Sequence, residues 1–119
     1  MYISESDKSL IRQLVEKQLQ AFQEDDLETA FALTSPKIQS QFSAQDFVEI
    51  LSNEYGAIVK PRSVMFRGFT VVKNFPALIS TIMDRDGNLV KAIFVVQLQQ
   101  DYSWRLHGYD LIGINEKIV

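Results

Sequence analysis

The stretch VKAIFVVQL, residues 90–98, alternates between the two sides of an extended chain. Its even positions are all apolar, whereas its odd positions mix Ile93 and Val95 with Lys91 and Gln97. A repeat of two residues places successive side chains on opposite faces of a β-strand. The stretch therefore predicts a strand with one wholly apolar face and a second face that is half apolar.

The same alternation, rich in β-branched and aromatic residues, recurs on both sides of this stretch. It predicts four strands, at residues 63–73, 77–84, 90–99 and 104–114. Asp86-Gly87 favours a tight hairpin between the second and third strands, because glycine readily adopts a positive φ. We therefore predict an antiparallel meander.

Before Pro61 the apolar residues are spaced by three and four positions, which is typical of helices. The first helix has an apolar stripe from Leu10 to Phe22, an N-cap at Ser4 or Ser6, and an acidic end at Glu24, Asp25 and Asp26. A second helix spans residues 27–34 and breaks or restarts at Ser35-Pro36, and a third opens at Ser43 and closes at Gly56. Helices followed by strands predict an α+β fold, with the helices packed on one face of a curved sheet.

The composition indicates one ordinary folded domain, residues 1–119, of which 46% are hydrophobic. Its 12 basic and 15 acidic side chains, 12 minus 15 or a net charge of −3, argue against binding to nucleic acid or to an anionic membrane. The absence of cysteine excludes disulfides, thiol catalysis and zinc-cysteine sites. The polar start of the chain and the shortness of its longest apolar run, residues 92–96, lead us to expect a cytoplasmic protein that does not span a membrane.

Several segments resemble an uncharacterised bacterial family within the nuclear transport factor 2-like superfamily, which also includes ketosteroid isomerase-like and polyketide cyclase-like proteins. They are AFQEDD at 21–26, AFALTSPKI at 30–38, Phe42, PRSVMF at 61–66 and SWRL at 103–106. The resemblance covers residues 10–108 and implies a cone-shaped, cystatin-like fold with a curved sheet around a long helix, often dimeric through the sheet. The interval Ser35 to Ser43 is shorter than in many members, which implies a pocket that is shallower or partly filled.

A fold shared by enzymes, binding modules and structural subunits does not choose among them. Our first hypothesis is a non-catalytic homodimer that binds a small apolar ligand or a protein partner in an apolar cone. The residues expected to line the cone are Phe22, Phe31, Phe47, Tyr55, Phe66, Phe94 and Trp104. Those expected on the outer, dimer-forming face of the sheet are Met65, Phe69, Val71, Ile93, Val95 and His107.

Two alternatives remain open from the sequence. One is an isomerase-like or cyclase-like enzyme that uses acid–base chemistry, for which the available groups are Tyr55, Asp46, Tyr109, Asp110 and Thr70. No spacing rule ties these five residues together. The other alternative is a purely structural subunit, whose sign would be an apolar surface beyond the dimer interface.

Other chemistry-bearing residues have simpler explanations. His107, the only histidine, lies on the outer face if Trp104 points inward, so we expect a hydrogen-bonded or interfacial histidine rather than a base or metal ligand. The segment 84–88 carries glycine in the wrong position for a calcium loop and is more typical of a turn.

The acidic residues at 24–28 are typical of helix caps. The five glycines are too far apart to form a phosphate-binding loop. Arginines 62, 67 and 105, near Tyr102 and Trp104, are too scattered for a nucleic-acid site. We therefore expect no metal and no cofactor.

Overall fold

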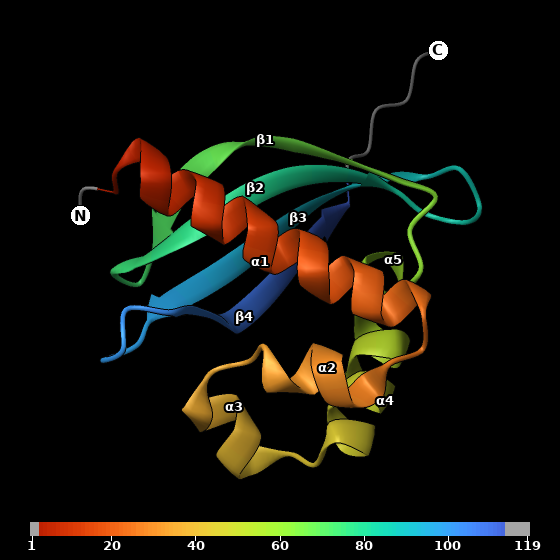
Figure 1. The fold of residues 1–119 in the computed structure, drawn as a ribbon. Coiled ribbons are helices and arrows are strands. Elements are labelled where there is room, and N and C mark those ends of the chain that lie inside the picture. Colours follow the sequence, from red (N-terminus) through yellow and green to blue (C-terminus); the bar gives the residue numbers. More distant parts are fainter. Residues whose placement is uncertain (1–2, 114–119) are drawn as a thin grey trace.

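The computed structural model describes residues 3–113, in which five helices precede four strands (Figure 1). The helices are α1 (Glu5–Gln23), α2 (Leu27–Ala32), α3 (Pro36–Gln41), α4 (Ala44–Glu54) and α5 (Gly56–Val59). The strands are β1 (Ser63–Val72), β2 (Phe75–Met83), β3 (Leu89–Leu98) and β4 (Trp104–Gly113). The α+β prediction is confirmed, and α3 and α5 are additional to the three predicted helices.

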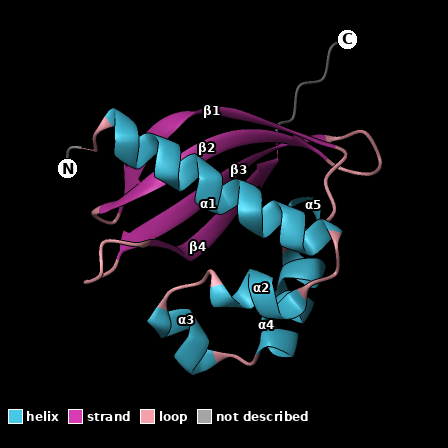
Figure 2. Ribbon diagram, viewed as in Figure 1, coloured by secondary structure: helices cyan, strands magenta, loops and turns pink. Residues whose placement is uncertain are grey.

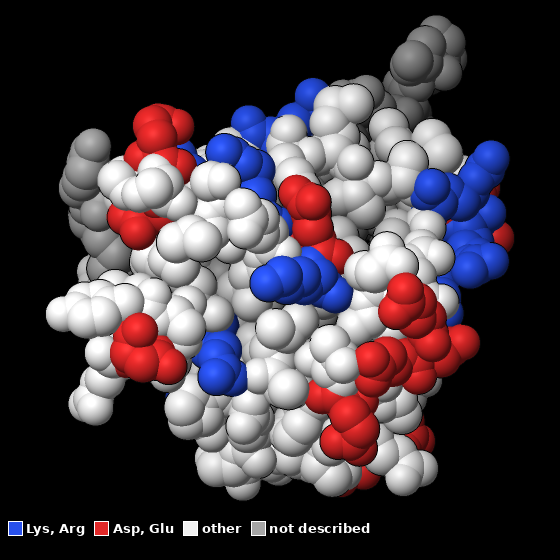
Figure 3. Space-filling model, viewed as in Figure 1, with Lys and Arg blue, Asp and Glu red and all other residues white. Residues whose placement is uncertain are grey.

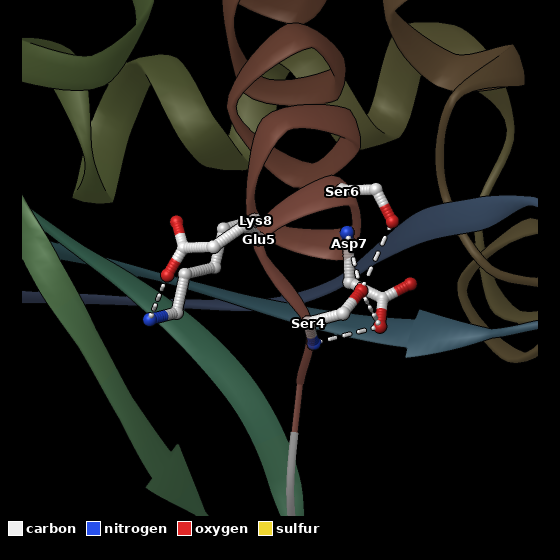
Figure 4. A network of polar contacts seen from close by, with 5 residues as sticks. All are labelled: Ser4, Glu5, Ser6, Asp7 and Lys8. Carbon is white, nitrogen blue, oxygen red and sulfur yellow. Dashed lines mark hydrogen bonds and ion pairs between the residues drawn. The ribbon is translucent and has the colours of Figure 1, made fainter.

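Helix α1 is held at both ends by side chains. At its start, the Ser4 hydroxyl accepts from the Asp7 backbone N–H at 3.0 Å, while the Asp7 carboxylate accepts from the Ser4 N–H at 3.0 Å (Figure 4). These hydrogen bonds to Ser4 lower the pKa of the Asp7 carboxyl. At its end, the Lys60 ammonium donates to the Phe22 carbonyl at 2.8 Å and pairs with Asp25 at 2.8 Å. A cation there complements the free carbonyls of the last turn.

The four strands form one antiparallel sheet in the order β1-β2-β3-β4. Each pair is joined by a tight turn with a residue in the left-handed region: Lys73 and Asn74 after β1, Gly87 after β2, and Tyr102 after β3. Two consecutive residues with positive φ form a two-residue hairpin turn, so β2 begins at Phe75, two residues earlier than predicted.

Helix α1 lies across one face of the sheet, and α2, α3 and α4 gather beside the β4 edge (Figure 2). The core between α1 and the sheet is formed by fully buried side chains such as Ile11, Phe94 and Leu106. The edge of β4 is covered by the segment after α2, because Leu106 donates its N–H to Leu33 and accepts from the N–H of Ser35. This pairing fixes the start of α3 beside β4 and covers the edge of β4 at Leu106.

Two irregularities in the ladders change which residues share a face. The register shifts in β1 between Phe66 and Gly68, so that Phe69 pairs with the buried Leu78 and faces α1. The prediction that Phe69 and Val71 lie on the outer face with Met65 is therefore wrong, since a bulge inserts one residue and reverses the alternation that follows it. A second shift, at His107 in β4, keeps Trp104 and Leu106 on the helix side.

Candidate functional site

A small apolar pocket lies between α3, α4 and β4, with a volume of about 190 Å³. We call it the α4 pocket and define it by its lining: Ile38, Phe42, Phe47, Ile50, Leu51, Glu54, Tyr55 and Tyr109. Phe47, Leu51 and Tyr55 come from successive turns of α4, because the spacing of three and four residues puts them on one side of that helix. Of the residues predicted to line a cone, Phe47 and Tyr55 are in this pocket.

The inner wall of the α4 pocket ends in a buried polar chain. The Tyr109 hydroxyl donates to Gln18 Oε1 at 2.6 Å, and Gln18 Nε2 donates to the Ala30 carbonyl at 3.0 Å. Gln18 is only 1% exposed, so this chain satisfies polar groups that would otherwise be stranded in the core. Burial raises the pKa of Tyr109 well above its ordinary value, and its bond with Gln18 opposes part of that rise. Tyr109 therefore remains a neutral phenol.

The other residues expected in a single cone are distributed over the fold. Phe22 and Phe94 are buried in the core, and Phe31 packs on Phe47 with ring centroids 5.6 Å apart. Phe66 borders a separate hollow between α1 and β1. Trp104 borders another hollow beside α1, and its buried indole N–H has no hydrogen-bond partner among the described residues. Side chains thus fill the middle of the cone, and the open space lies at its α4 end.

A larger hollow, about 470 Å³, is a groove between α1 and α2. Seven of its nine lining residues are polar or charged, among them Glu16, Lys17 and Asp26, so its surface is less apolar than that of the α4 pocket. Small-molecule sites are lined predominantly by apolar and aromatic groups with few polar ones. The α4 pocket meets that description better than this larger groove does.

The five groups proposed for acid–base chemistry do not converge. Tyr55 and Tyr109 lie together, with ring centroids 6.5 Å apart. Asp46 is exposed in the first turn of α4, and Asp110 is exposed on the outer face of the sheet opposite Ile93. Thr70 is exposed on β1. An isomerase-type site requires a carboxylate beside the hydroxyl donors inside the pocket, and neither aspartate is placed there. The carboxylate that lines the pocket with Tyr55 and Tyr109 is that of Glu54, which is not among the five predicted groups.

His107 is tied to the loop that covers β4. Its Nδ1 lies 2.8 Å from the hydroxyl of the fully buried Ser35, and its ring packs on Phe75 with centroids 4.7 Å apart. Burial lowers the pKa of His107 the most, and the nearby positive charge of Lys37 lowers it further. Because Ser35 has no exposed surface, a substrate cannot approach its hydroxyl, and the pair acts as a structural clamp.

The acidic segments behave as caps and turns. Asp26 accepts from the backbone N–H of Thr29 at 3.2 Å at the start of α2, and Asp84 accepts from the N–H groups of Asp86 and Asn88 within the β2–β3 turn. Among residues 3–113, no group of three or more histidines, cysteines, aspartates and glutamates is arranged to hold a metal ion. Arg67 and Arg105 lie on opposite edge strands and donate to Thr81 and the Ala32 carbonyl, respectively.

The sequence analysis did not predict Gln18 at the site, although the sequence contains a clear signal for it. It is a polar residue on the buried stripe of α1, beside Leu14, Val15 and Leu19. A polar side chain on an apolar helix face needs an internal partner, which here is Tyr109. Glu54 was also missed, although it lies seven residues after Phe47 and so shares its side of α4. Ile38 and Phe42 carry no such signal, because their position depends on how α3 lies relative to α4.

Comparison with known proteins identifies the fold. The model of a family described as "Domain of unknown function (DUF4864)" matches residues 4–118. A crystal structure of an "NTF-2 like protein of unknown function" from Burkholderia xenovorans LB400 is similar, with a TM-score of 0.56 and 14% sequence identity over 93% of this chain and 89% of that one. No curated protein matches the sequence. None of the helices in the described part of the chain has the length and apolar character required to cross a membrane.

Proposed function

Since the chain belongs to the DUF4864 family of unknown function and has the NTF-2-like fold, we propose that it is a binding module whose α4 pocket holds a small ligand by its apolar surface. The observation that carries this proposal is the lining of the pocket: three aliphatic side chains, four aromatic rings and one carboxylate at the rim. Convergent apolar walls with few polar groups are typical of sites that bind by excluding water.

The size of the pocket limits the ligand. Its volume of about 190 Å³ is far below that of a site for a drug-sized molecule, which is roughly 300 Å³ or more. An apolar cavity of roughly 150 Å³ is large enough for benzene. The ligand, or the part of it that enters, therefore has the size of a single small ring or a branched cluster of methyl groups.

The experiment is a calorimetric titration with para-cresol and with dimethylbutanol, two neutral probes of this size. We expect saturable binding to the wild-type protein and loss of binding in Ile50→Trp, because the larger ring would occupy the pocket. The matched control is Leu10→Trp, an exposed apolar position on α1 that does not line the pocket. Binding that persists in Ile50→Trp, or no saturable binding of either probe to the wild type, contradicts the proposal.

We also propose that the module is a homodimer formed by the outer face of the sheet. Across all four strands this face presents Met65, Ile79, Ile93 and Ile112, of which Met65 is 55% and Ile112 46% exposed. Thr81 and Lys91 lie between Met65 and Ile112 across the sheet, and Asp110 lies opposite Ile93. Exposed apolar side chains across a whole sheet face are uncommon on a monomer, and a second copy of the same face would cover them isologously.

A further inference from the structure

Four aromatic side chains line the open space of the α4 pocket. Phe47 of α4 and Tyr55, the residue after α4, pack against the ring of Tyr109, with centroids 6.1 and 6.5 Å from it. Phe42, at the end of α3, lines the same space and is 36% exposed. The face of an aromatic ring carries negative electrostatic potential, so several rings around one space attract a cation.

The charged side chains of the α4 pocket lining and of α4 are acidic, whereas α3 carries one basic residue, Lys37, next to the lining residue Ile38. Glu54 is the one charged lining residue of the pocket, and it forms no ion pair with a described residue. Helix α4 carries Asp46, Glu49 and Glu54 and has no lysine or arginine. Acidic side chains also gather over the end of α1 and the neighbouring α2 (Figure 3). The pocket therefore lies in a negative field that favours a positively charged ligand.

Hydrogen bonding in the α4 pocket selects among cations. The Tyr109 hydroxyl already donates its proton to Gln18, and the aliphatic walls, Ile38, Ile50 and Leu51, neither donate nor accept. The acceptors left for a cation are the Glu54 carboxylate at the rim and the Tyr55 hydroxyl. A primary ammonium has three N–H groups, so these two residues replace only part of its hydration, and an unsatisfied N–H group is costly. A quaternary ammonium has no N–H group and presents only methyl groups around its charge.

We propose that the α4 pocket binds a quaternary ammonium group, with the methyl groups against the four rings and Glu54 at the rim balancing the charge. This inference rests on the proposed function, because it names the ligand class of the same site. A trimethylammonium group is compact enough for a space of about 190 Å³.

The test compares choline with dimethylbutanol, its neutral isostere in which carbon replaces nitrogen, by calorimetry at constant ionic strength. The two probes have the same shape, so their difference in affinity reports the charge. We expect choline to bind the wild-type protein about tenfold more tightly, the size of effect expected from desolvated cation–π contacts.

Variants separate the contributions of charge and rings. Glu54→Gln should weaken choline binding severalfold and leave dimethylbutanol binding unchanged, because only choline is charged. The matched control is Glu49→Gln, a carboxylate on the same helix that does not line the pocket. Tyr55→Leu, which replaces a ring with an aliphatic group, should also weaken choline more than dimethylbutanol.

Each outcome is decisive. Equal affinities, or tighter binding of dimethylbutanol, would overturn the quaternary ammonium proposal while leaving the apolar pocket as the binding site. No saturable binding of either neutral probe, dimethylbutanol or para-cresol, would overturn the proposed function as well. Choline binding that Glu49→Gln weakens as much as Glu54→Gln does would place the cation outside the α4 pocket.

Discussion

At the scale of single residues, His107 connects the sheet to the loop before α3. Its imidazole is held between the Ser35 hydroxyl and the ring of Phe75. The pKa of His107 is lowered in the folded protein by burial and by Lys37, so the unfolded chain binds a proton at a higher pH than the folded chain does. The clamp is thus strongest when the imidazole is neutral.

We predict that the free energy of unfolding decreases as the pH falls below 6.5, the ordinary pKa of histidine. Between the lowered pKa of His107 in the folded protein and 6.5, the unfolded state binds more protons than the folded state does. The free energy of unfolding therefore rises with pH across this range, and it decreases when the pH falls through the same range. Urea unfolding at several pH values measures this. His107→Asn preserves a hydrogen-bonding atom but does not titrate, and it should flatten the curve; an unchanged slope would contradict the assignment.

The carboxyls whose pKa values are lowered act in a separate pH range. Asp7, Asp26 and Asp101 are stabilised as carboxylates by hydrogen bonds to Ser4, Thr29 and Ser103, respectively. Their contribution to stability is lost only as the pH falls below 3.8, their ordinary value. The effect of His107 on stability therefore lies in a higher pH range than the effect of these carboxyls.

A second prediction at this scale concerns Tyr109. Tyr109→Phe removes the donor to Gln18 Oε1 and leaves that buried oxygen without its partner, so it should lower the free energy of unfolding by about 1–3 kcal/mol. Tyr55→Phe is the matched control, because the Tyr55 hydroxyl makes no hydrogen bond to a described residue. Equal effects of the two substitutions in urea unfolding would show that the buried chain is not what stabilises this region.

At the scale of elements, Lys60 fastens the end of α1 to the loop before β1. Lys60→Ala removes the donor to the Phe22 and Gln23 carbonyls and the ion pair with Asp25, so it should destabilise the protein by about 1 kcal/mol. Lys17→Ala, at an exposed position of α1 itself, is the control. Thermal unfolding of both variants checks this, and similar melting temperatures for the two would contradict it.

The elements also mark how far the sequence predicts the structure. Periodicity was sufficient for α1, α2, α4 and the four strands, because each buries one regular face. It failed at the bulge near Arg67, where one inserted residue turned Phe69 toward α1, and alternation alone contains no signal for an insertion. For α3, the sequence left open whether the chain breaks or restarts at Ser35-Pro36, and the structure shows a restart with Ser35 as the N-cap. Backbone pairing between Ser35 and Leu106 positions this short helix.

The candidate site was partly predictable for the same reasons. Phe47 and Tyr55 follow the helical repeat of α4 and were expected at a pocket. Glu54 follows the same repeat, seven residues after Phe47, although it was not predicted. Phe42 and Ile38 reach the pocket only because the chain folds α3 toward α4, a tertiary arrangement that local patterns do not encode. The single cone expected from the resemblance is filled by core side chains such as Phe22 and Phe94.

At the scale of the whole molecule, the proposed dimer makes a further prediction. Ile93→Lys and Met65→Lys each place a charge on the outer face of the sheet and should convert a dimer into a monomer, because burying an unpaired charge is costly. Leu10→Lys, on α1, is the control and should leave the mass unchanged. Light scattering measures the mass; a monomeric wild type, or a dimer that persists in both variants, contradicts this interface.

The central claim is that the α4 pocket is the ligand site, and nuclear Overhauser effects between bound choline and the protein test it most directly. We predict contacts from the choline methyl protons to the rings of Phe47, Tyr55 and Tyr109. Contacts instead to side chains of the groove between α1 and α2, such as Lys17 and Thr29, or no contact to any pocket ring at saturating choline, would contradict it.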